Sequence, residues 1–359
     1  LKAKLRAWEI ADVNREVMHL RHPGEVQVVA VSPDGKYLAT TNVDHVTRIW
    51  EIGNEQQVVR LASDSGGDAL AFSPDGQYLA TGGGPSARVW RVSSGVEIAR
   101  LKHRSEEGDA AITGGVASAP PGDIRSVAFS PDGKYLATAS DDFTARVWEI
   151  GSGREVSRIA HEGIVNTVVF SADGKYLATA SWDKTAHVWE VQTGAEVVRM
   201  SHTYSVTTMH YSPDGTRVAT TTSGDNLARV WDAAKTDTEV AHMTHEDTIA
   251  QVIFSPDGKL LATASGQLVR MWDADKMDTE VKSLAHKSPV VDVAFSPDGK
   301  VLATASGRLT LVWDATSGWE TSRKEYDNMV TSVVFSPDGK YLVAVSGADV
   351  WVHESPNGE

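Results

Sequence analysis

The chain contains a histidine, a serine and an aspartate whose side chains could form a nucleophilic triad. His161, Ser181 and Asp183 precede Trp189, and a Ser–His–Asp set can activate a hydroxyl by general-base catalysis. The histidine, however, belongs to a repeating set. Ten residues before the serines of eight similar turns stand His22, Ser63, Pro120, His161, His202, His245, His286 and Tyr326. A degenerate set that repeats along a chain does not describe one active site, so we interpret these residues as structural.

Metal binding is the next chemistry that the 12 histidines and many aspartates suggest. The repeated histidines lie in different copies of the repeat, so they should not converge on one ion. The chain also lacks the short His-x-His and His-Glu-x-x-His spacings that are typical of metal sites. No metal site and no cofactor are therefore predicted.

Composition excludes other classes of function. The chain has no cysteine, which excludes disulfides, thiolate metal sites and cysteine nucleophiles, and favours a cytoplasmic location. Lys plus Arg number 34 and Asp plus Glu number 48, so the net charge is −14. Nucleic acids and anionic membranes attract basic surfaces, so neither is predicted as a partner. No apolar run approaches the roughly 20 residues of a membrane span.

The candidate residues are positioned by a repeat. Ser-Pro-Asp-Gly occurs seven times, and Ser171 to Gly174 is an eighth copy in which Ala172 replaces the proline. The first serines are 40 to 43 residues apart, except for one interval of 57 residues. An apolar run precedes each turn, and an alternating segment, a segment that ends in Trp and a weaker fourth segment follow it. Four short strands in about 41 residues predict an all-β blade.

The repeat resembles the WD-repeat family over essentially the whole chain. The matching dipeptides are Trp231-Asp232, Trp272-Asp273 and Trp313-Asp314, and Glu replaces Asp after Trp50, Trp148 and Trp189. The resemblance implies one eight-bladed β-propeller domain over residues 1–359. It also implies that His161, Ser181, Asp183 and Trp189 form a hydrogen-bonded chain between the third strand and the inner strands of their blade. Gly84, Gly266 and Gly307 replace the aspartate of this set in three copies.

The resemblance further implies that the two ends of the chain close the ring. Within residues 1–20, the segment Asn14 to Leu20 resembles the outermost strands and can complete the eighth blade. Either Leu5 to Ile10 or Ala348 to His353 can be the third strand of that blade, because the chain offers nine candidates for eight places. Sequence alone leaves both possibilities open.

Departures from the repeat are the candidates for binding. Residues 103–121 are inserted between the second and third copies, and Trp182 occupies a turn on the same face. Polar residues Gln27, Asp68, Arg125 and Asn166 are expected at the mouth of the channel. Asp141 lies near them. These six residues form the predicted binding site, whereas Trp319 is expected on the side of the ring.

We predict a non-catalytic scaffold that binds a protein or peptide. Closely similar repeats resemble those of bacterial proteins that combine a propeller with an effector domain, and the chain opens with Leu1. We therefore expect a monomeric sensor or interaction domain, excised from a larger signalling protein. The alternative is a hydrolase-like enzyme on the insertion-bearing face, with Arg125, Asp141 and His103 as its acid/base groups. A purely structural role is the third possibility.

Overall fold

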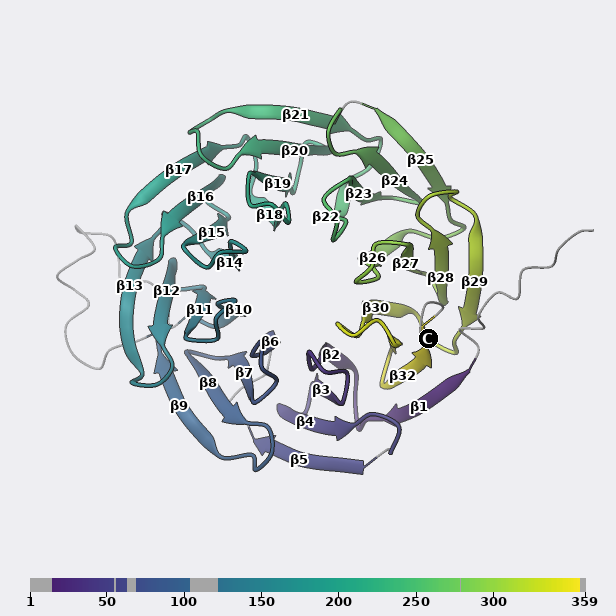
Figure 1. Cartoon of the computed structure of the whole chain (residues 1–359), viewed down its shortest axis with the longest axis horizontal. Coiled ribbons are helices and arrows are strands. Elements are labelled where there is room, and N and C mark those ends of the chain that lie inside the picture. The colour runs from purple at the N-terminus through teal and green to yellow at the C-terminus, as the bar shows by residue number, and fades with distance from the viewer. Residues whose placement is uncertain (1–14, 55, 63–68, 104–121, 278, 356–359) are drawn as a thin grey trace, which may run out of the picture.

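The computed structural model describes residues 15–54, 56–62, 69–103, 122–277 and 279–355. These residues form 32 strands in eight four-stranded antiparallel sheets. The sheets stand around a central axis like the blades of a propeller (Figure 1). The prediction of an all-β, eight-bladed propeller is confirmed.

Each blade has the same strand order from the central axis outwards (Figure 1). The innermost strands are β2 (Val26–Val31), β6 (Ala69–Phe72), β10 (Ile124–Phe129), β14 (Val165–Phe170), β18 (Val206–Tyr211), β22 (Ile249–Phe254), β26 (Val290–Phe295) and β30 (Val330–Phe335). The second strands are β3 (Tyr37–Asn42), β7 (Tyr78–Gly83), β11 (Tyr135–Ser140), β15 (Tyr176–Ser181), β19 (Arg217–Thr222), β23 (Leu260–Ser265), β27 (Val301–Ser306) and β31 (Tyr341–Ser346). The third strands are β4 (Val46–Glu51), β8 (Ser86–Arg91), β12 (Thr144–Glu149), β16 (Thr185–Glu190), β20 (Leu227–Asp232), β24 (Leu268–Asp273), β28 (Leu309–Asp314) and β32 (Asp349–Glu354). The outermost strands are β5 (Gln56–Ala62), β9 (Glu97–Lys102), β13 (Arg154–Ala160), β17 (Glu196–Ser201), β21 (Glu239–Thr244), β25 (Glu280–Ala285), β29 (Glu320–Glu325) and β1 (Glu16–Arg21).

The turn between the first and second strands has a chemical cause that is visible in the third blade. Ser130 Oγ donates to Asp132 Oδ1 at 2.6 Å, and the same oxygen accepts from the Lys134 amide at 3.1 Å. Gly133 has a φ of 71°, in the left-handed region that favours glycine. The Ser-Pro-Asp-Gly motif therefore encodes a tight reversal.

The two ends of the chain share the eighth blade. β1 pairs with β32 in antiparallel register, with Leu20 opposite Val350 and Arg21 opposite Asp349. The third strand of this blade is therefore β32, in the segment Ala348 to His353, whereas Leu5 to Ile10 lies outside the described residues. Pairing of the two termini confirms the predicted closure, and it covers the edge that β32 would otherwise expose.

Hydrophobic packing holds neighbouring blades together. Between the fourth and fifth blades, Val188 and Met200 contact a cluster that includes Val206 and the indole of Trp231. All four side chains are buried. The same arrangement recurs around the ring, so each repeat completes its core with its neighbour.

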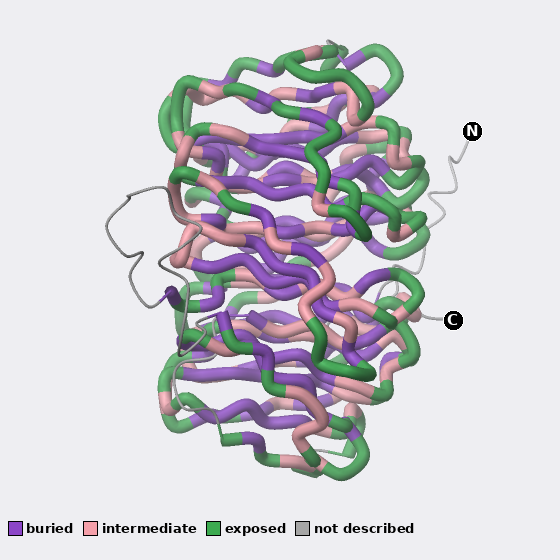
Figure 2. Tube along the Cα trace, turned by 90° about the vertical axis from the view of Figure 1, so that its left-hand side faces the viewer, coloured by how far each residue is buried: buried purple, intermediate pink, exposed green. Residues whose placement is uncertain are grey.

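The propeller has two different faces, which Figure 2 shows edge-on, with buried strands between exposed turns. The loop face carries the connections between blades and the turns between second and third strands. The turn face carries the Ser-Pro-Asp-Gly turns and the connections between third and fourth strands. Within the part of the chain that the structure describes, no helix has the length and hydropathy that a membrane span requires.

Candidate functional site

The residues with triad-like chemistry form a buried link in the fourth blade. Trp189 Nε1 donates to Thr179 Oγ1 at 2.9 Å, and His161 Nε2 lies 2.8 Å from the same hydroxyl. His161 Nδ1 lies 2.9 Å from Asp183 Oδ2. The side chains of His161 and Asp183 are both buried. The link therefore joins the connection before β14 to the second and third strands of the blade.

Ser181 is not the hydroxyl of this link, in contrast to the sequence prediction. Trp189 lies opposite Leu177 in the register between β15 and β16, so Thr179 is two residues further along β15 and Ser181 is four. Because a strand rises about 3.3 Å per residue, Ser181 is beyond the reach of the indole. Ser181 Oγ instead donates to the Gly163 carbonyl at 3.2 Å and accepts from the Asp183 amide at 3.1 Å.

The bond between a tryptophan and a threonine recurs in the first seven blades. The pairs are Trp50 with Thr40, Trp90 with Thr81, Trp148 with Thr138, Trp189 with Thr179, Trp231 with Thr220, Trp272 with Thr263, and Trp313 with Thr304. In the eighth blade, where His353 takes the place of the tryptophan, the Tyr326 hydroxyl lies 3.0 Å from His353 Nε2. Each of these seven indole N–H groups thus has a partner, as buried donors require.

The third blade corrects the sequence alignment of the histidines. His103, not Pro120, contacts Thr138 Oγ1, at 2.6 Å, and Asp142 Oδ2, at 3.0 Å. His103 directly precedes residues 104–121, which lie outside the described residues, so counting ten residues back from the turn reaches Pro120 instead. His103 is 1% exposed. It therefore belongs to the buried link and does not stand beside Arg125 and Asp141 as an accessible base.

Electrostatics stabilise the ionised forms of Asp142 and Asp183, and burial stabilises the neutral forms of His202 and His245. Burial opposes ionisation of Asp142, but the hydrogen bond and charge of His103, with Thr144 and Arg146, lower its pKa to about 2. The pKa of Asp183 is held well below its usual range against burial by His161 and Thr185. Burial lowers the pKa values of His202 and His245 to about 4. These values describe structural groups that keep one protonation state near neutral pH.

The polar residues predicted at the channel mouth have separate environments. Arg125 makes a bidentate ion pair with Asp141, at 2.7 and 2.6 Å, and the arginine remains exposed. Asn166 donates to the Thr207 carbonyl of the next blade at 2.8 Å. Gln27 is exposed, and Asp68 lies outside the described residues. The structure thus brings Arg125 and Asp141 together, whereas Asn166 connects two blades.

Trp182 lies on the loop face with a second aromatic residue nearby. Trp182 is 50% exposed and Tyr204 is 43% exposed. Ser205 Oγ, directly after Tyr204, donates to the Trp182 carbonyl at 2.9 Å. A Cβ at Gly224 would lie 2.6 Å from Tyr204 Cδ1, so the tyrosine ring rests on that glycine. The sequence prediction did not include Tyr204. The signal that could have identified it is its difference from the corresponding residues of other copies, Gly163, Asp247 and Ser288.

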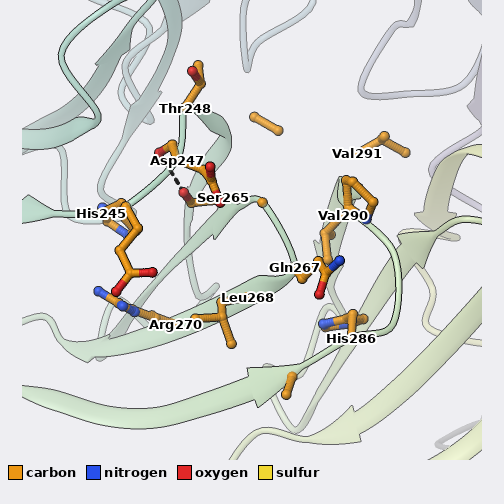
Figure 3. Close-up of a pocket in the computed structure, with 15 residues that line it drawn as sticks. His245, Asp247, Thr248, Ser265, Gln267, Leu268, Arg270, His286, Val290 and Val291 are labelled. Atoms are coloured by element: carbon orange, nitrogen blue, oxygen red, sulfur yellow. Dashed lines mark hydrogen bonds between the residues drawn. The ribbon is translucent and has the colours of Figure 1, made fainter.

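A hollow of about 750 Å³ lies on the loop face between the sixth and seventh blades. Figure 3 shows His245, Asp247 and Arg270 on one side of it, and Gln267 and His286 on the other. Glu246 and Asp247 are exposed at its rim. In the sequence, this hollow is marked by Gly266, which stands where four other copies have Asp. Gly266 has a φ of 53° in the turn between the second and third strands.

No group of three or more His, Asp or Glu residues with metal-site geometry occurs among the described residues.

Trp319, expected on the side of the ring, lies between β28 and β29 on the turn face and is 76% exposed. It is therefore an exposed tryptophan on the face opposite to Trp182.

The closed ring and its Trp–Thr–His links define an eight-bladed propeller of WD-type repeats. The family described as "WD domain, G-beta repeat" matches residues 14–51, 68–91, 116–149, 153–190, 195–232, 238–273, 278–314 and 321–349. The chain therefore belongs to the WD40 family.

Two curated relatives and one solved structure are similar to this chain. The chain is 25% identical over 146 residues to the small ribosomal subunit protein RACK1 of Drosophila melanogaster, covering 41% of this chain and 44% of that protein. It is 26% identical over 146 residues to RACK1 of Caenorhabditis elegans, covering 41% and 43%. The chain thus spans less than half the length of these curated relatives. The crystal structure of the computationally designed Ika8 protein has the same fold, with a TM-score of 0.78, 21% identity, and coverage of 95% of this chain and 100% of that one.

Proposed function

We propose that this propeller is a non-catalytic scaffold that binds a protein or peptide on its loop face. The observation that carries the proposal is the exposure of Trp182 beside Tyr204. Both aromatic side chains lie on a rigid ring of blades, so they lose little conformational entropy when a partner covers them. Trp and Tyr dominate the binding energy of measured interfaces, because they combine a large apolar area with a polar atom.

The surroundings of the aromatic pair support a partner that contributes polar and basic groups. Asp141 is the residue of the third blade that corresponds to Trp182 in the fourth. Its carboxylate forms an ion pair with the exposed Arg125. Further round the same face, Glu246 and Asp247 border the hollow between the sixth and seventh blades. A carboxylate rim attracts lysine or arginine side chains and steers their approach.

Membership of the WD40 family supports the general role, because its propellers mediate protein interactions. The proposal includes a signalling role in the bacterial cytoplasm, as a monomeric propeller joined to an effector domain. The close similarity of the repeats to one another supports these more specific parts of the proposal. The buried position of His103 supports a non-catalytic function, because it removes the base from the set Arg125, Asp141 and His103.

The experiment starts with a peptide library selected for binding to the whole chain. The affinity of each selected peptide is then measured for the wild type, Trp182→Ala and Trp319→Ala. Trp319 is the matched control, because it is also exposed but lies on the turn face. We expect Trp182→Ala to weaken binding about 30-fold or more, as loss of an interface anchor costs about 2 kcal/mol. Trp319→Ala should leave the affinity unchanged.

The opposite result would place the partner elsewhere. If Trp319→Ala abolishes binding and Trp182→Ala leaves it intact, the loop-face proposal is wrong. A second variant, Tyr204→Ala, tests the pair: it should weaken the same peptides, because a shared apolar anchor loses area with either ring.

A further inference from the structure

A ring of proline–glycine contacts runs around the turn face. The proline of one Ser-Pro-Asp-Gly turn packs against the glycine of the next blade's turn, and a Cβ built on that glycine would lie 3.3 to 3.9 Å from the proline Cδ. Six junctions between described turns have this contact: Pro33 with Gly76, Pro74 with Gly133, Pro131 with Gly174, Pro213 with Gly258, Pro256 with Gly299, and Pro297 with Gly339. At the junction that closes the ring, the Asp338 side chain covers Gly35.

The junction between the fourth and fifth blades breaks the ring. Ala172 replaces the proline, and a Cβ built on Gly215 would meet no described atom within 4 Å. One other departure meets the same junction, because Tyr211 ends the innermost strand where six other blades have Phe. Ala233 follows the third strand where the first four blades have Ile or Val, and the sixth and seventh blades have Ala at the same position. The missing proline ring therefore distinguishes the space at this junction.

This space is a hollow of about 580 Å³ on the turn face. Tyr176 and Val197 of the fourth blade line it, together with Tyr211, Gly215 and Ala233 of the fifth. Tyr176 is 36% exposed, so an aromatic ring is presented at the surface. The volume lies in the range of sites that hold a small ligand or part of a peptide.

Tyr211 gives the hollow a polar group without a partner. Its side chain is 7% exposed, and its hydroxyl has no hydrogen-bond partner among the described residues. Burial, with the nearby charge of Asp173, raises the pKa of Tyr211, so the hydroxyl keeps its proton and can donate. A buried donor without an acceptor is unfavourable, and a ligand carbonyl would remove that penalty.

The charged groups at the rim are already paired. Lys235 Nζ lies 2.9 Å from Asp232 Oδ2, and the Arg217 guanidinium donates to the Ala274 carbonyl in the sixth blade. These contacts leave apolar side chains and the hydroxyls of Tyr176 and Tyr211 as the binding surface. The chemistry therefore favours an uncharged, apolar ligand with a carbonyl acceptor.

We propose that this hollow is a docking site for a proline-containing segment of a partner protein. The other junctions supply the template, because six of them place a pyrrolidine ring over the equivalent glycine. An extended polyproline segment has no internal hydrogen bonds, so its carbonyls are free to accept from Tyr211. Aromatic side chains with a donor are the surface on which such segments dock. The site lies on the face opposite to Trp182, so it is independent of the loop-face proposal.

The test uses the whole ¹⁵N-labelled chain and a proline decamer, with a Gly-Ser decamer as the control peptide. We expect saturable shifts of the Gly215 amide with the proline decamer only. Ala172→Pro fills the hollow with the protein's own ring and should abolish these shifts. Tyr211→Phe removes the donor and should weaken binding about tenfold, the equivalent of one hydrogen bond. Trp182→Ala should bind as the wild type does.

Several results would overturn the proposal. Absence of saturable binding to the wild type, or equal binding of both decamers, would exclude a proline site. Binding to Ala172→Pro with wild-type affinity would show that the hollow is not the site. Equal affinity of Tyr211→Phe and the wild type would overturn the assigned role of the hydroxyl. The thermal midpoint of each variant shows whether it is folded, so loss of structure cannot be mistaken for loss of the site.

Discussion

Trp189 donates its indole N–H to the Oγ1 of Thr179 at 2.9 Å. The same hydroxyl lies 2.8 Å from His161 Nε2, and Asp183 lies 2.9 Å from the other ring nitrogen. An ionised carboxylate only accepts, so His161 Nδ1 carries the proton. The Thr179 oxygen accepts from Trp189 and lies within hydrogen-bond distance of His161 Nε2. One threonine thus satisfies two buried groups on different elements.

The first prediction concerns this threonine. Thr179→Val keeps the shape of the side chain but leaves Trp189 Nε1 and His161 Nε2 without a hydrogen-bond partner. We expect the free energy of unfolding to fall by about 2 to 4 kcal/mol, because each stranded buried group costs about 1 to 3 kcal/mol. Urea unfolding at neutral pH measures this. Thr179→Ser should retain most of the stability, and a loss for Ser181→Ala as large as for Thr179→Val would contradict the assigned geometry.

The architecture was predictable because its signals are local and repeat. Ser-Pro-Asp-Gly encodes a reversal within four residues, and eight copies at a near-constant spacing reveal the number of blades. The choice between Thr179 and Ser181 was not predictable in this way, because both hydroxyls point to the same side of β15. Only the register that sets Trp189 opposite Leu177 decides between them. The role of His103 was not predictable for a related reason, because the additional residues after it change its distance from the turn.

The second prediction is a loss of stability in acid. Burial, followed for His202 by the charge of Arg229, lowers the pKa values of His202 and His245 to about 4, from the ordinary histidine value of about 6.5. Between pH 6.5 and 4 the unfolded chain therefore binds more protons than the folded chain, and stability falls as pH falls. Each histidine can remove about 3 kcal/mol over this window.

Urea unfolding at a series of pH values between 7.5 and 4.5 checks this prediction. His245→Gln removes one of the titrating groups, so the slope of stability against pH should be shallower than in the wild type, whatever its stability at pH 7.5. A wild-type stability that is constant from pH 7 to 5 would show that these histidines do not resist protonation.

The third prediction concerns the closure of the ring. Deletion of residues 1–21 removes β1, which exposes the edge of β32 and uncovers the pocket that holds Met18 and Leu20, both now buried. An open strand edge with apolar neighbours promotes association. We expect the truncated chain to form larger species in light scattering. His19→Ala is the control, because it loses the stacking on Trp351 at 3.6 Å but keeps the strand, and should elute as the wild type does.

The binding surfaces were only partly predictable from sequence. Trp182 was found because it differs from the corresponding residues of the other copies, and Arg125 and Asp141 were found because they are polar and near the channel. The hollow between the fourth and fifth blades was not predictable from the sequence, because Ala172 and Tyr211 are single changes far apart in the chain. Only the folded ring places both changes at one junction. Tertiary packing, rather than a motif, creates that site.

The last prediction uses the same junction to test the packing of the ring. Ala172→Pro should stabilise the protein by about 0.4 to 1 kcal/mol, because proline reduces the entropy of the unfolded chain where the native backbone accepts it. Seven other copies have proline at this position of the turn, so the backbone is expected to fit. The new ring would also contact Gly215, where a built Cβ now meets no described atom within 4 Å. Pro131→Ala makes the reverse change at the preceding junction, where Gly174 would lose its contact with Pro131, and should destabilise by a similar amount. Urea unfolding of both variants should therefore give changes of opposite sign, and a destabilised Ala172→Pro would show that the turn at Ser171 differs from its seven counterparts.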